Sequence, residues 1–273
     1  MFFLIVISPT PAYAANFEFK QGSFSKVTGA APQIQNITGL GFQPKAVIFY
    51  FTNNTVNGIR PGQTFGIGYT NGTNGMRSAG FTCDNGAAVA NCGRYRSSNA
   101  TIDVLVPGTP ILIASAELNQ LHGDGFALRW TINDANPDII HYVAIGGTDV
   151  THTKVGTFTL SNSAGDQAVT GLGFKPDFIM FLWTFREQEA TLAHDAQLGF
   201  GFAKNLTSQG ASLVFGRDPR PANDGYKSRQ YWGNSIILLT STGVQDAIAN
   251  LKSMDGDGFT VTKTDDPAAV TPI

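Results

Sequence analysis

One phrase occurs twice in this chain of 273 residues, and it limits what the chain can fold into. Residues 38–51 read TGLGFQPKAVIFYF and residues 170–183 read TGLGFKPDFIMFLW, with seven of fourteen positions identical. The separation of 132 residues is close to the length of one ordinary domain. A repeat with this period indicates two similar modules in tandem.

The similarity extends beyond the phrase. At an offset of 133 residues, FGIGYTNG (65–72) aligns with LGFGFAKN (198–205), and GDGFALRWT (123–131) aligns with GDGFTVTKT (256–264). Upstream, GSFSKVTGAAPQIQN (22–36) resembles GTFTLSNSAGDQAVT (156–170). We therefore divide the chain into a first module of residues 16–150 and a second module of residues 151–273.

Both modules are rich in strand signals. AVIFYF and FIMFLW are short apolar runs of β-branched and aromatic residues, which favour buried strands. FGIGY and LGFGF alternate glycine with large apolar residues, so another element is expected to pack closely on the bare face. The fold class predicted is all-β, with two tandem antiparallel β-sandwich modules of jelly-roll type. Trp130 and Trp183 are expected in the cores.

One short helix per module is also compatible with the pattern. Residues 243–254 place Val244, Ile248 and Leu251 on one helical face. The corresponding stretch of the first module, residues 108–121, is ambiguous between helix and strand. The Asp-Gly pairs at 124–125 and 257–258 are interpreted as turns that lead into strands.

The two ends of the chain carry separate expectations. Residues 1–14 contain an apolar run followed by Ala12-Tyr13-Ala14, which is typical of a signal-peptide remnant cleaved after Ala14; an ordinary first strand is the alternative. By the offset of 133, Ile273 corresponds to Ile140, so the second module stops where its partner's last strand begins. Truncation is the favoured interpretation, and residues 2–7 or a neighbouring subunit are the alternative sources of that strand.

Charge and hydropathy argue against nucleic acid and a membrane span, and the two cysteines suggest a disulfide. Eighteen Lys and Arg against 20 Asp and Glu give a net charge of −2, without the basic patch that nucleic acid requires. No apolar run approaches the ~20 residues of a membrane span. In an exported protein, Cys83 and Cys92 are expected to form a local disulfide; two free thiols are the alternative.

Motifs of catalysis are absent from the sequence. There is no GxSxG elbow, HExxH, Walker loop or CxxC, and the offset pairs no histidine with another histidine. We therefore predict no catalytic residue, no metal and no cofactor.

Two groups of polar residues are candidates for ligand binding. The densest cluster lies in the loop 185–195 and comprises Arg186, Glu187, Glu189, His194 and Asp195. Glu187 and Glu189 have the chemistry of a glycosidase pair, and a solvated loop is the alternative. The second group combines arginines with aromatics at matching places, namely Arg94, Tyr95 and Arg96 in one module and Arg229, Tyr231 and Trp232 in the other. Rings stack on sugars and guanidinium groups form forked hydrogen bonds, but such residues also occur on plain strand faces.

The ordered set GLGFQPKAVIFY, FGIGY, a lone Arg, DGF-L-WT and HYVAIGG resembles an uncharacterised β-rich module of phage, prophage and environmental sequences. It is also loosely similar to the H-type lectin domain, a small antiparallel sandwich that binds sugars as a trimer. The resemblance implies a β-sandwich and transfers no binding residue.

The leading functional hypothesis is a non-enzymatic adhesion protein, exported or virion-associated, that binds surface glycans. The first alternative is a structural part of a phage fibre or surface assembly that contacts its own copies or other virion proteins. The second alternative is a glycan-degrading hydrolase that uses Glu187 and Glu189.

Overall fold

The computed structural model consists of β-strands and contains no helix among its described residues. These residues are 16–59, 61–84, 89–108, 111–184, 193–218, 220–221, 226–240, 242–265, 267 and 271–273. The predicted signal remnant, residues 1–14, lies outside them. The all-β prediction is confirmed, and Trp130 and Trp183 are buried as expected. Within this part of the chain, nothing helical has the length and apolarity needed to cross a membrane.

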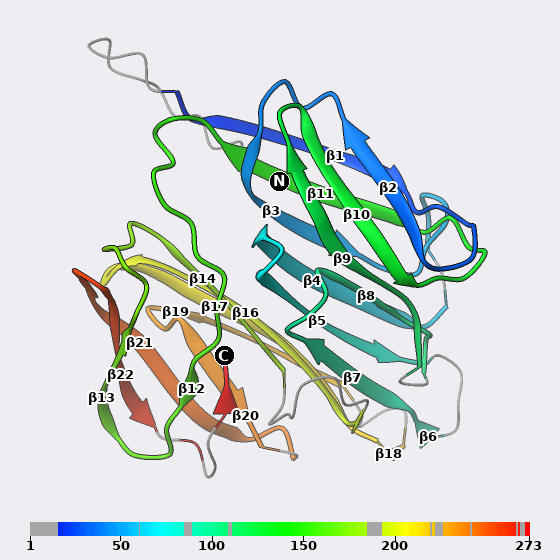
Figure 1. Cartoon of the computed structure of the whole chain (residues 1–273). Helices are drawn as coiled ribbons and strands as arrows, with labels where there is room; N and C mark the ends of the chain where they lie inside the picture. The colour runs from blue at the N-terminus through cyan, green and yellow to red at the C-terminus, as the bar shows by residue number, and fades with distance from the viewer. Residues whose placement is uncertain are drawn as a thin grey trace.

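The first half of the chain folds into two antiparallel sheets (Figure 1). One has the order β1-β11-β3-β4-β5-β7 and the other the order β2-β10-β9-β8. Phe49, Phe126 and Ile140 lie fully buried between the sheets. The strands are β1 (Glu18–Ser25), β2 (Gln33–Thr38), β3 (Pro44–Phe51), β4 (Gln63–Gly72), β5 (Gly75–Cys83), β6 (Val89–Ala90), β7 (Cys92–Ser97), β8 (Ile102–Leu105), β9 (Leu112–His122), β10 (Gly125–Ile132) and β11 (Ile139–Gly146).

The second half repeats this strand order. Its sheets run β14-β16-β17-β19 and β13-β22-β21-β20, and a short pair joins β12 to β23. Recurrence of the order is what a tandem duplication predicts, and the duplication itself stays an interpretation. The strands are β12 (Thr159–Leu160), β13 (Gly165–Thr170), β14 (Ile179–Thr184), β15 (Ala193–His194), β16 (Ala196–Asn205), β17 (Ser208–Gly216), β18 (Arg220–Pro221), β19 (Tyr226–Trp232), β20 (Ile236–Leu239), β21 (Gln245–Asp255), β22 (Gly258–Asp265) and β23 (Thr271–Pro272).

The helix predicted for residues 243–254 is wrong. This stretch is β21, which pairs with β20 on one side and β22 on the other. Ala247, Ala249 and Leu251 are buried at a period of two, whereas Val244 is 59% exposed. Of the supposed helical face, Leu251 lies in the core, Ile248 is only partly buried and Val244 faces solvent. Pairing on both edges outweighs the helix propensity of the alanines.

The repeated phrase forms a turn that the Asp-Gly pair closes. The Asp124 carboxylate accepts hydrogen bonds from the backbone N–H groups of Gly39 (2.9 Å) and Gly41 (2.6 Å). In the second half, Asp257 accepts from Gly171 (3.0 Å) and Gly173 (2.6 Å). The two halves thus use the phrase in the same way, as scaffold.

The alternating glycines of β4 and β16 allow close packing, as predicted. A Cβ on Gly68 would lie 1.7 Å from the Thr101 carbonyl oxygen, and a Cβ on Gly201 would lie 1.9 Å from the Ser235 carbonyl oxygen. Only glycine permits this approach of one sheet to the other.

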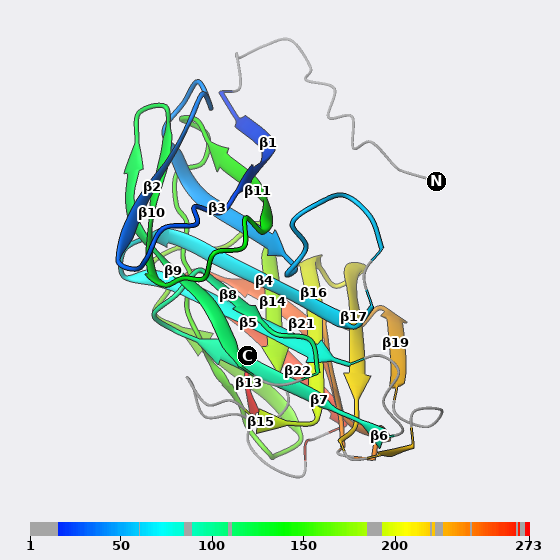
Figure 2. The ribbon, with the colours of Figure 1, turned by 90° about the vertical axis from the view of Figure 1, so that its right-hand side faces the viewer.

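The outer face of the larger sheet of the first half packs against the outer face of the β14-β16-β17-β19 sheet and joins the halves. Figure 2 shows β14 and β16 crossing β5. Phe81 of β5 clusters with Leu198 of β16 and with the disulfide between Cys83 and Cys92. Two short ladders, β15 on β7 and β18 on β6, add backbone hydrogen bonds between the halves.

Candidate functional site

The predicted Arg-Tyr-Arg group does not form one surface, because successive residues of β7 point to opposite faces. Arg94 is 8% exposed and donates to the Asp195 carbonyl oxygen, so it joins the halves. Tyr95 is buried in the first core, where burial and the nearby Asp103 carboxylate raise its pKa. Arg96 is partly buried and lines a groove between the halves.

The predicted loop cluster is described only at its end. Arg186, Glu187 and Glu189 lie outside the described residues. The backbone of His194 pairs with Gly93, and its side chain is not described. Asp195 has a left-handed φ of 57° and accepts a hydrogen bond from the Asp218 backbone N–H at 2.7 Å. The role that the structure gives to Asp195 is to hold the junction of the halves.

The candidates on β19 are separated from the first group. The backbones of Arg229 and Tyr231 lie opposite Leu213 and Ala211, and their side chains are not described. Trp232 ends the strand with 80% of its surface exposed. An indole so exposed is available to stack on a ligand, but Trp232 lines neither the groove beside Arg96 nor the polar pocket described next.

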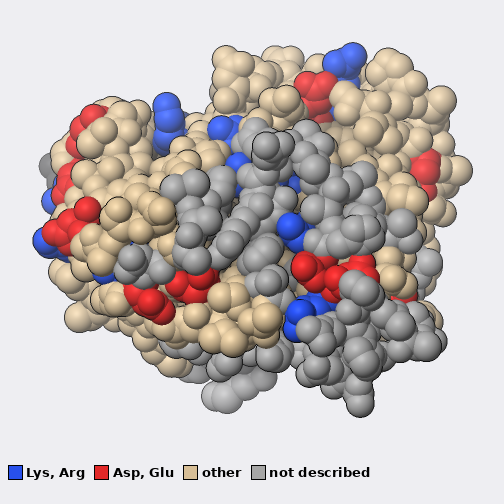
Figure 3. Space-filling model, turned by 90° about the horizontal axis from the view of Figure 1, so that it is seen from below, with Lys and Arg blue, Asp and Glu red and all other residues tan. Residues whose placement is uncertain are grey.

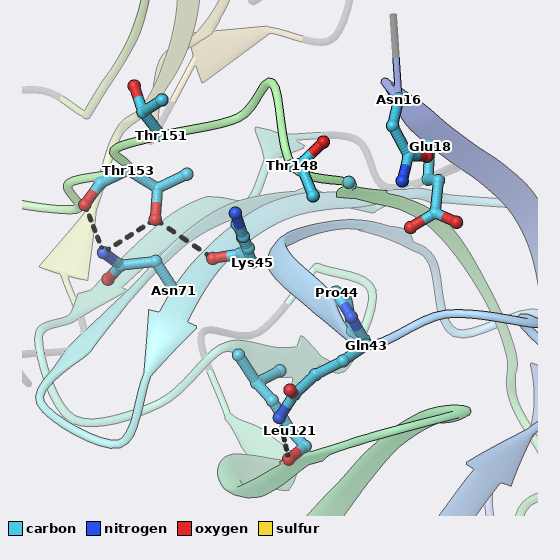
Figure 4. A pocket seen from close by; sticks show the side chains of 11 residues that line it. Asn16, Glu18, Gln43, Pro44, Lys45, Asn71, Leu121, Thr148, Thr151 and Thr153 are labelled. Atoms are coloured by element: carbon cyan, nitrogen blue, oxygen red, sulfur yellow. Dashed lines mark hydrogen bonds between the residues drawn. The ribbon is translucent and has the colours of Figure 1, made fainter. Parts of the chain in front are cut away.

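A polar surface pocket of about 470 Å³ lies where β1, β3, the β4–β5 turn and the segment after β11 meet. Figure 4 shows Glu18, Thr148 and Lys45 along one side of it, with Gln43 and Leu121 across from them. Its described lining is Asn16, Glu18, Gln43, Pro44, Lys45, Asn71, Leu121, Gly147, Thr148, Thr151 and Thr153. Amides and hydroxyls dominate, so the pocket offers both donors and acceptors.

Hydrogen bonds fix the segment after β11 against the first sandwich. The Asn71 amide donates to the Thr153 carbonyl oxygen at 2.8 Å, and the Thr153 hydroxyl donates to the Lys45 carbonyl oxygen at 3.1 Å (Figure 4). The Lys45 ammonium donates to the Val150 carbonyl oxygen at 2.7 Å, and the Gln43 amide donates to the Leu121 carbonyl oxygen at 3.2 Å. The walls are therefore held in place before any ligand arrives.

Sequence reasoning missed this pocket because its residues come from five distant segments without a common motif. The available signal was the threonine-rich stretch TDVTHT (148–153) between the modules. A polar segment that joins two modules is a usual place for a binding site.

Asp103 is a second unusual group, buried inside the first core. Its carboxylate accepts hydrogen bonds from the hydroxyls of Ser78 and, at 2.7 Å, Ser115. Burial raises the pKa of Asp103 to about 7, although the two serine hydrogen bonds lower it. Because Asp103 is 1% exposed, no ligand reaches it in this structure, and it acts within the core.

The described residues contain no group of three His, Cys, Asp or Glu side chains placed to hold a metal ion. On the face seen in Figure 3, Lys and Arg are interspersed with Asp and Glu among a majority of uncharged residues. The described residues of this face therefore form no broad patch of one charge.

Comparison with known proteins identifies no relative. No family model matches the chain, and neither the curated proteins nor the solved structures contain a match. The resemblance to phage modules and H-type lectins remains an interpretation of the sequence.

Proposed function

We propose that this protein is a non-enzymatic binding module, exported or virion-associated, whose polar pocket holds a neutral polyhydroxylated ligand such as part of a surface glycan. The observation that carries the proposal is the lining of the 470 Å³ pocket by amides and hydroxyls on a preformed frame. Hydroxyl groups of a sugar both donate and accept, and such a lining serves both. The apolar side chain of Leu121 is available to a C–H face of the ring.

Binding is favoured over hydrolysis by the acid content of the pocket. Glycosidases of the usual kind need two carboxyl groups on either side of the scissile bond. Glu18 is the sole carboxylate among the described lining residues. Glu187 and Glu189 lie outside the description, so a hydrolase that uses them remains the weaker alternative.

The test is a glycan array followed by titration calorimetry with the best ligand. Gln43→Ala and Glu18→Ala should each weaken binding by about tenfold, or ~1.4 kcal/mol, because each removes a hydrogen-bonding group from the pocket. Trp232→Ala is compared with these pocket variants, because the exposed indole of Trp232 is the other candidate contact for a glycan. If Trp232→Ala abolishes binding while the pocket variants bind normally, the pocket assignment is wrong. An absence of any glycan binding contradicts the proposed function as a whole.

A structural role in an assembly has separate support. Among the described strands, β14 pairs with β16 alone and so leaves one edge of its sheet open. An open edge next to an apolar groove is suited to strand addition.

A further inference from the structure

A lysine lies in the interior of the first sandwich, at the point where two strands end. Lys26 directly follows β1, and Asn133 directly follows β10. The Lys26 side chain is 0% exposed, and its nitrogen lies over the Trp130 ring at 5.6 Å from the ring centre. Lysine is almost never fully buried unless it is paired. The groups that contact this nitrogen therefore decide what it can do.

Two residues that are neighbours in the sequence hold the Lys26 nitrogen. Its Nζ donates to Asn133 Oδ1 at 2.7 Å, to Asp134 Oδ1 at 2.8 Å and to the Asp134 carbonyl oxygen at 2.9 Å. The side-chain carbon of Asn133 is bonded to Oδ1, so it lies within about 3.9 Å of Nζ. Reacting atoms in a productive arrangement are about 3–3.5 Å apart. The amine and the amide are thus held close to the geometry of attack.

The two partners of Lys26 are themselves held in place. Asn133 Nδ2 donates to the carbonyl oxygens of Val27 at 2.9 Å and Gly29 at 2.7 Å, which fixes the orientation of the amide. The Asn136 amide donates to the second carboxylate oxygen of Asp134. The Asp134 side chain is 25% exposed, which leaves a path from the cluster to solvent. The groups are therefore preorganised, and a small leaving group can escape.

The second half closes the same strand position without a lysine. In the repeat, Leu160 takes the place of Lys26, and it is fully buried. A buried ion pair often stabilises a fold no more than apolar residues of similar volume, because two charges must leave water. Packing alone thus gives no reason for Lys26, whereas a reaction that removes both charges relieves the cost of burying them.

We propose that Lys26 and Asn133 form an intramolecular isopeptide bond once the first sandwich has folded. The Lys26 ammonium passes a proton to the Asp134 carboxylate, and the lone pair of the resulting amine forms a bond to the side-chain carbon of Asn133. A second proton moves from this nitrogen to Nδ2, the bond between the carbon and Nδ2 breaks, and ammonia leaves. The first proton stays on Asp134, so atoms and charge balance without a further reactant.

The bond joins the two sheets of the first sandwich. It links the end of β1, in the larger sheet, to the end of β10, in the β2-β10-β9-β8 sheet. Residues 26–133 then form one covalent loop. A force along the chain passes through the bond and bypasses the strands within that loop. This property suits a protein that holds on to a surface, but the bond does not depend on glycan binding.

Peptide mapping of the wild-type chain, unfolded after purification, tests the bond. Trypsin does not cleave after an acylated lysine, so the reacted protein should give one branched peptide that joins residues 21–45 to residues 130–154. Its mass should lie about 17 Da, the mass of ammonia, below the sum of the two peptides. Absence of the branched peptide from protein that is folded by circular dichroism overturns the proposal. A branch at Asp134, with loss of about 18 Da as water, overturns the assignment to Asn133.

Three variants identify the reacting groups. Lys26→Arg keeps the positive charge but lacks the amine, so it should give no branched peptide. Asp134→Asn keeps the shape of the proton acceptor without its basicity, and the yield of branched peptide should fall at least about tenfold. Lys263→Arg is the matched control, because Lys263 is also buried but lies in the second half, where it donates to the Gln167 side-chain oxygen at 3.3 Å. Its branched peptide should persist.

Equal yields in Asp134→Asn and the wild type would overturn the proposed route of the proton. A branched peptide in Lys26→Arg would overturn the assignment of the amine. The wild-type map decides the main question even where a variant fails to fold.

Discussion

At the scale of single residues, the two halves differ most clearly around Asp103. By the strand register, Asp103 of the first half corresponds to Ile237, and Ser115 corresponds to Ile248. Ala211 replaces Ser78 at the offset of 133. All three polar groups are thus exchanged for apolar ones together. This suggests that the cluster persists only as a complete network, because a partly satisfied buried polar group is costly.

The cluster predicts a pH dependence of stability. Asp103 has a folded pKa of about 7, above its ordinary value, so its favourable contribution is complete at acidic pH and is lost as the pH rises through about 7. The free energy of unfolding should fall by roughly 2–4 kcal/mol between pH 4 and pH 8 because of this group. Asn does not ionise, so the free energy of unfolding of Asp103→Asn should fall less between pH 4 and pH 8. Urea titrations at several pH values measure the difference.

The pH dependence of the free energy of unfolding is compared between the wild type and the variant, so that contributions common to both proteins cancel. The triple variant Ser78→Ala, Asp103→Ile, Ser115→Ile carries the residues of the second half and provides a second comparison. An unchanged slope in Asp103→Asn would show that the carboxyl is ionised throughout this range.

At the scale of the element, the turn of the repeated phrase depends on one carboxylate in each half. The backbone N–H groups of Gly41 and Gly39 lower the pKa of Asp124, and those of Gly173 and Gly171 lower the pKa of Asp257. Because both folded values lie below the ordinary one, the stabilisation is present at neutral pH and is lost as the pH falls through the folded pKa values.

Asp124→Ala and Asp257→Ala should therefore each lower Tm at pH 7, and the double variant should show the sum of the two effects, since the turns lie in different halves. The difference from the wild type should shrink in acid, where the carboxylates are protonated. Asp177→Ala is the control, an exposed aspartate for which no hydrogen bond to these turns is present. A Tm change equal to that of the control would mean that the turns close without the carboxylates.

The strands themselves were largely predictable, and the reasons are local. The β-branched and aromatic residues of AVIFYF and FIMFLW favour strands. The alternating glycines indicate that another element packs closely on the strand. The helix prediction for residues 243–254 failed because Val244, Ile248 and Leu251 recur at helical spacing, and only the pairing of β21 on both edges decides against a helix. The polar pocket was not predictable, since Glu18, Gln43 and Asn71 become neighbours only when separate strands assemble.

The predicted binding residues failed to assemble for a similar reason. Arg94 and Asp195 are strongly polar, which suggested a ligand. Instead, the Arg94 guanidinium donates to the Asp195 backbone carbonyl oxygen across the two halves, and the Asp195 carboxylate accepts from the Asp218 backbone N–H within the second half. A sequence does not distinguish an internal interface from an external one when both use the same kinds of side chain.

At the scale of the whole molecule, the two halves are held by the contact between the larger sheet of the first half and the β14-β16-β17-β19 sheet of the second. The disulfide between Cys83 and Cys92 lies in this contact, not on the outer surface. A Cβ on Gly216 of β17 would lie 2.6 Å from the Cys92 sulfur and 2.8 Å from the Cys83 sulfur. Gly216 therefore sets how closely the second half approaches the first.

Gly216→Ala should consequently destabilise the protein, although replacing a strand glycine by alanine ordinarily favours folding by roughly 0.5–1 kcal/mol. The added methyl group meets a cystine that has little room to move, and overpacking of this kind costs about 1–3 kcal/mol. Urea unfolding should show the loss, and hydrogen exchange should become faster in β5 and β17, the strands that meet there. Gly123→Ala is the matched control, because its Cβ would meet nothing within 4 Å, and its stability should stay within about 0.5 kcal/mol of the wild type. If the two variants have the same free energy of unfolding, the halves are not packed against each other through the cystine.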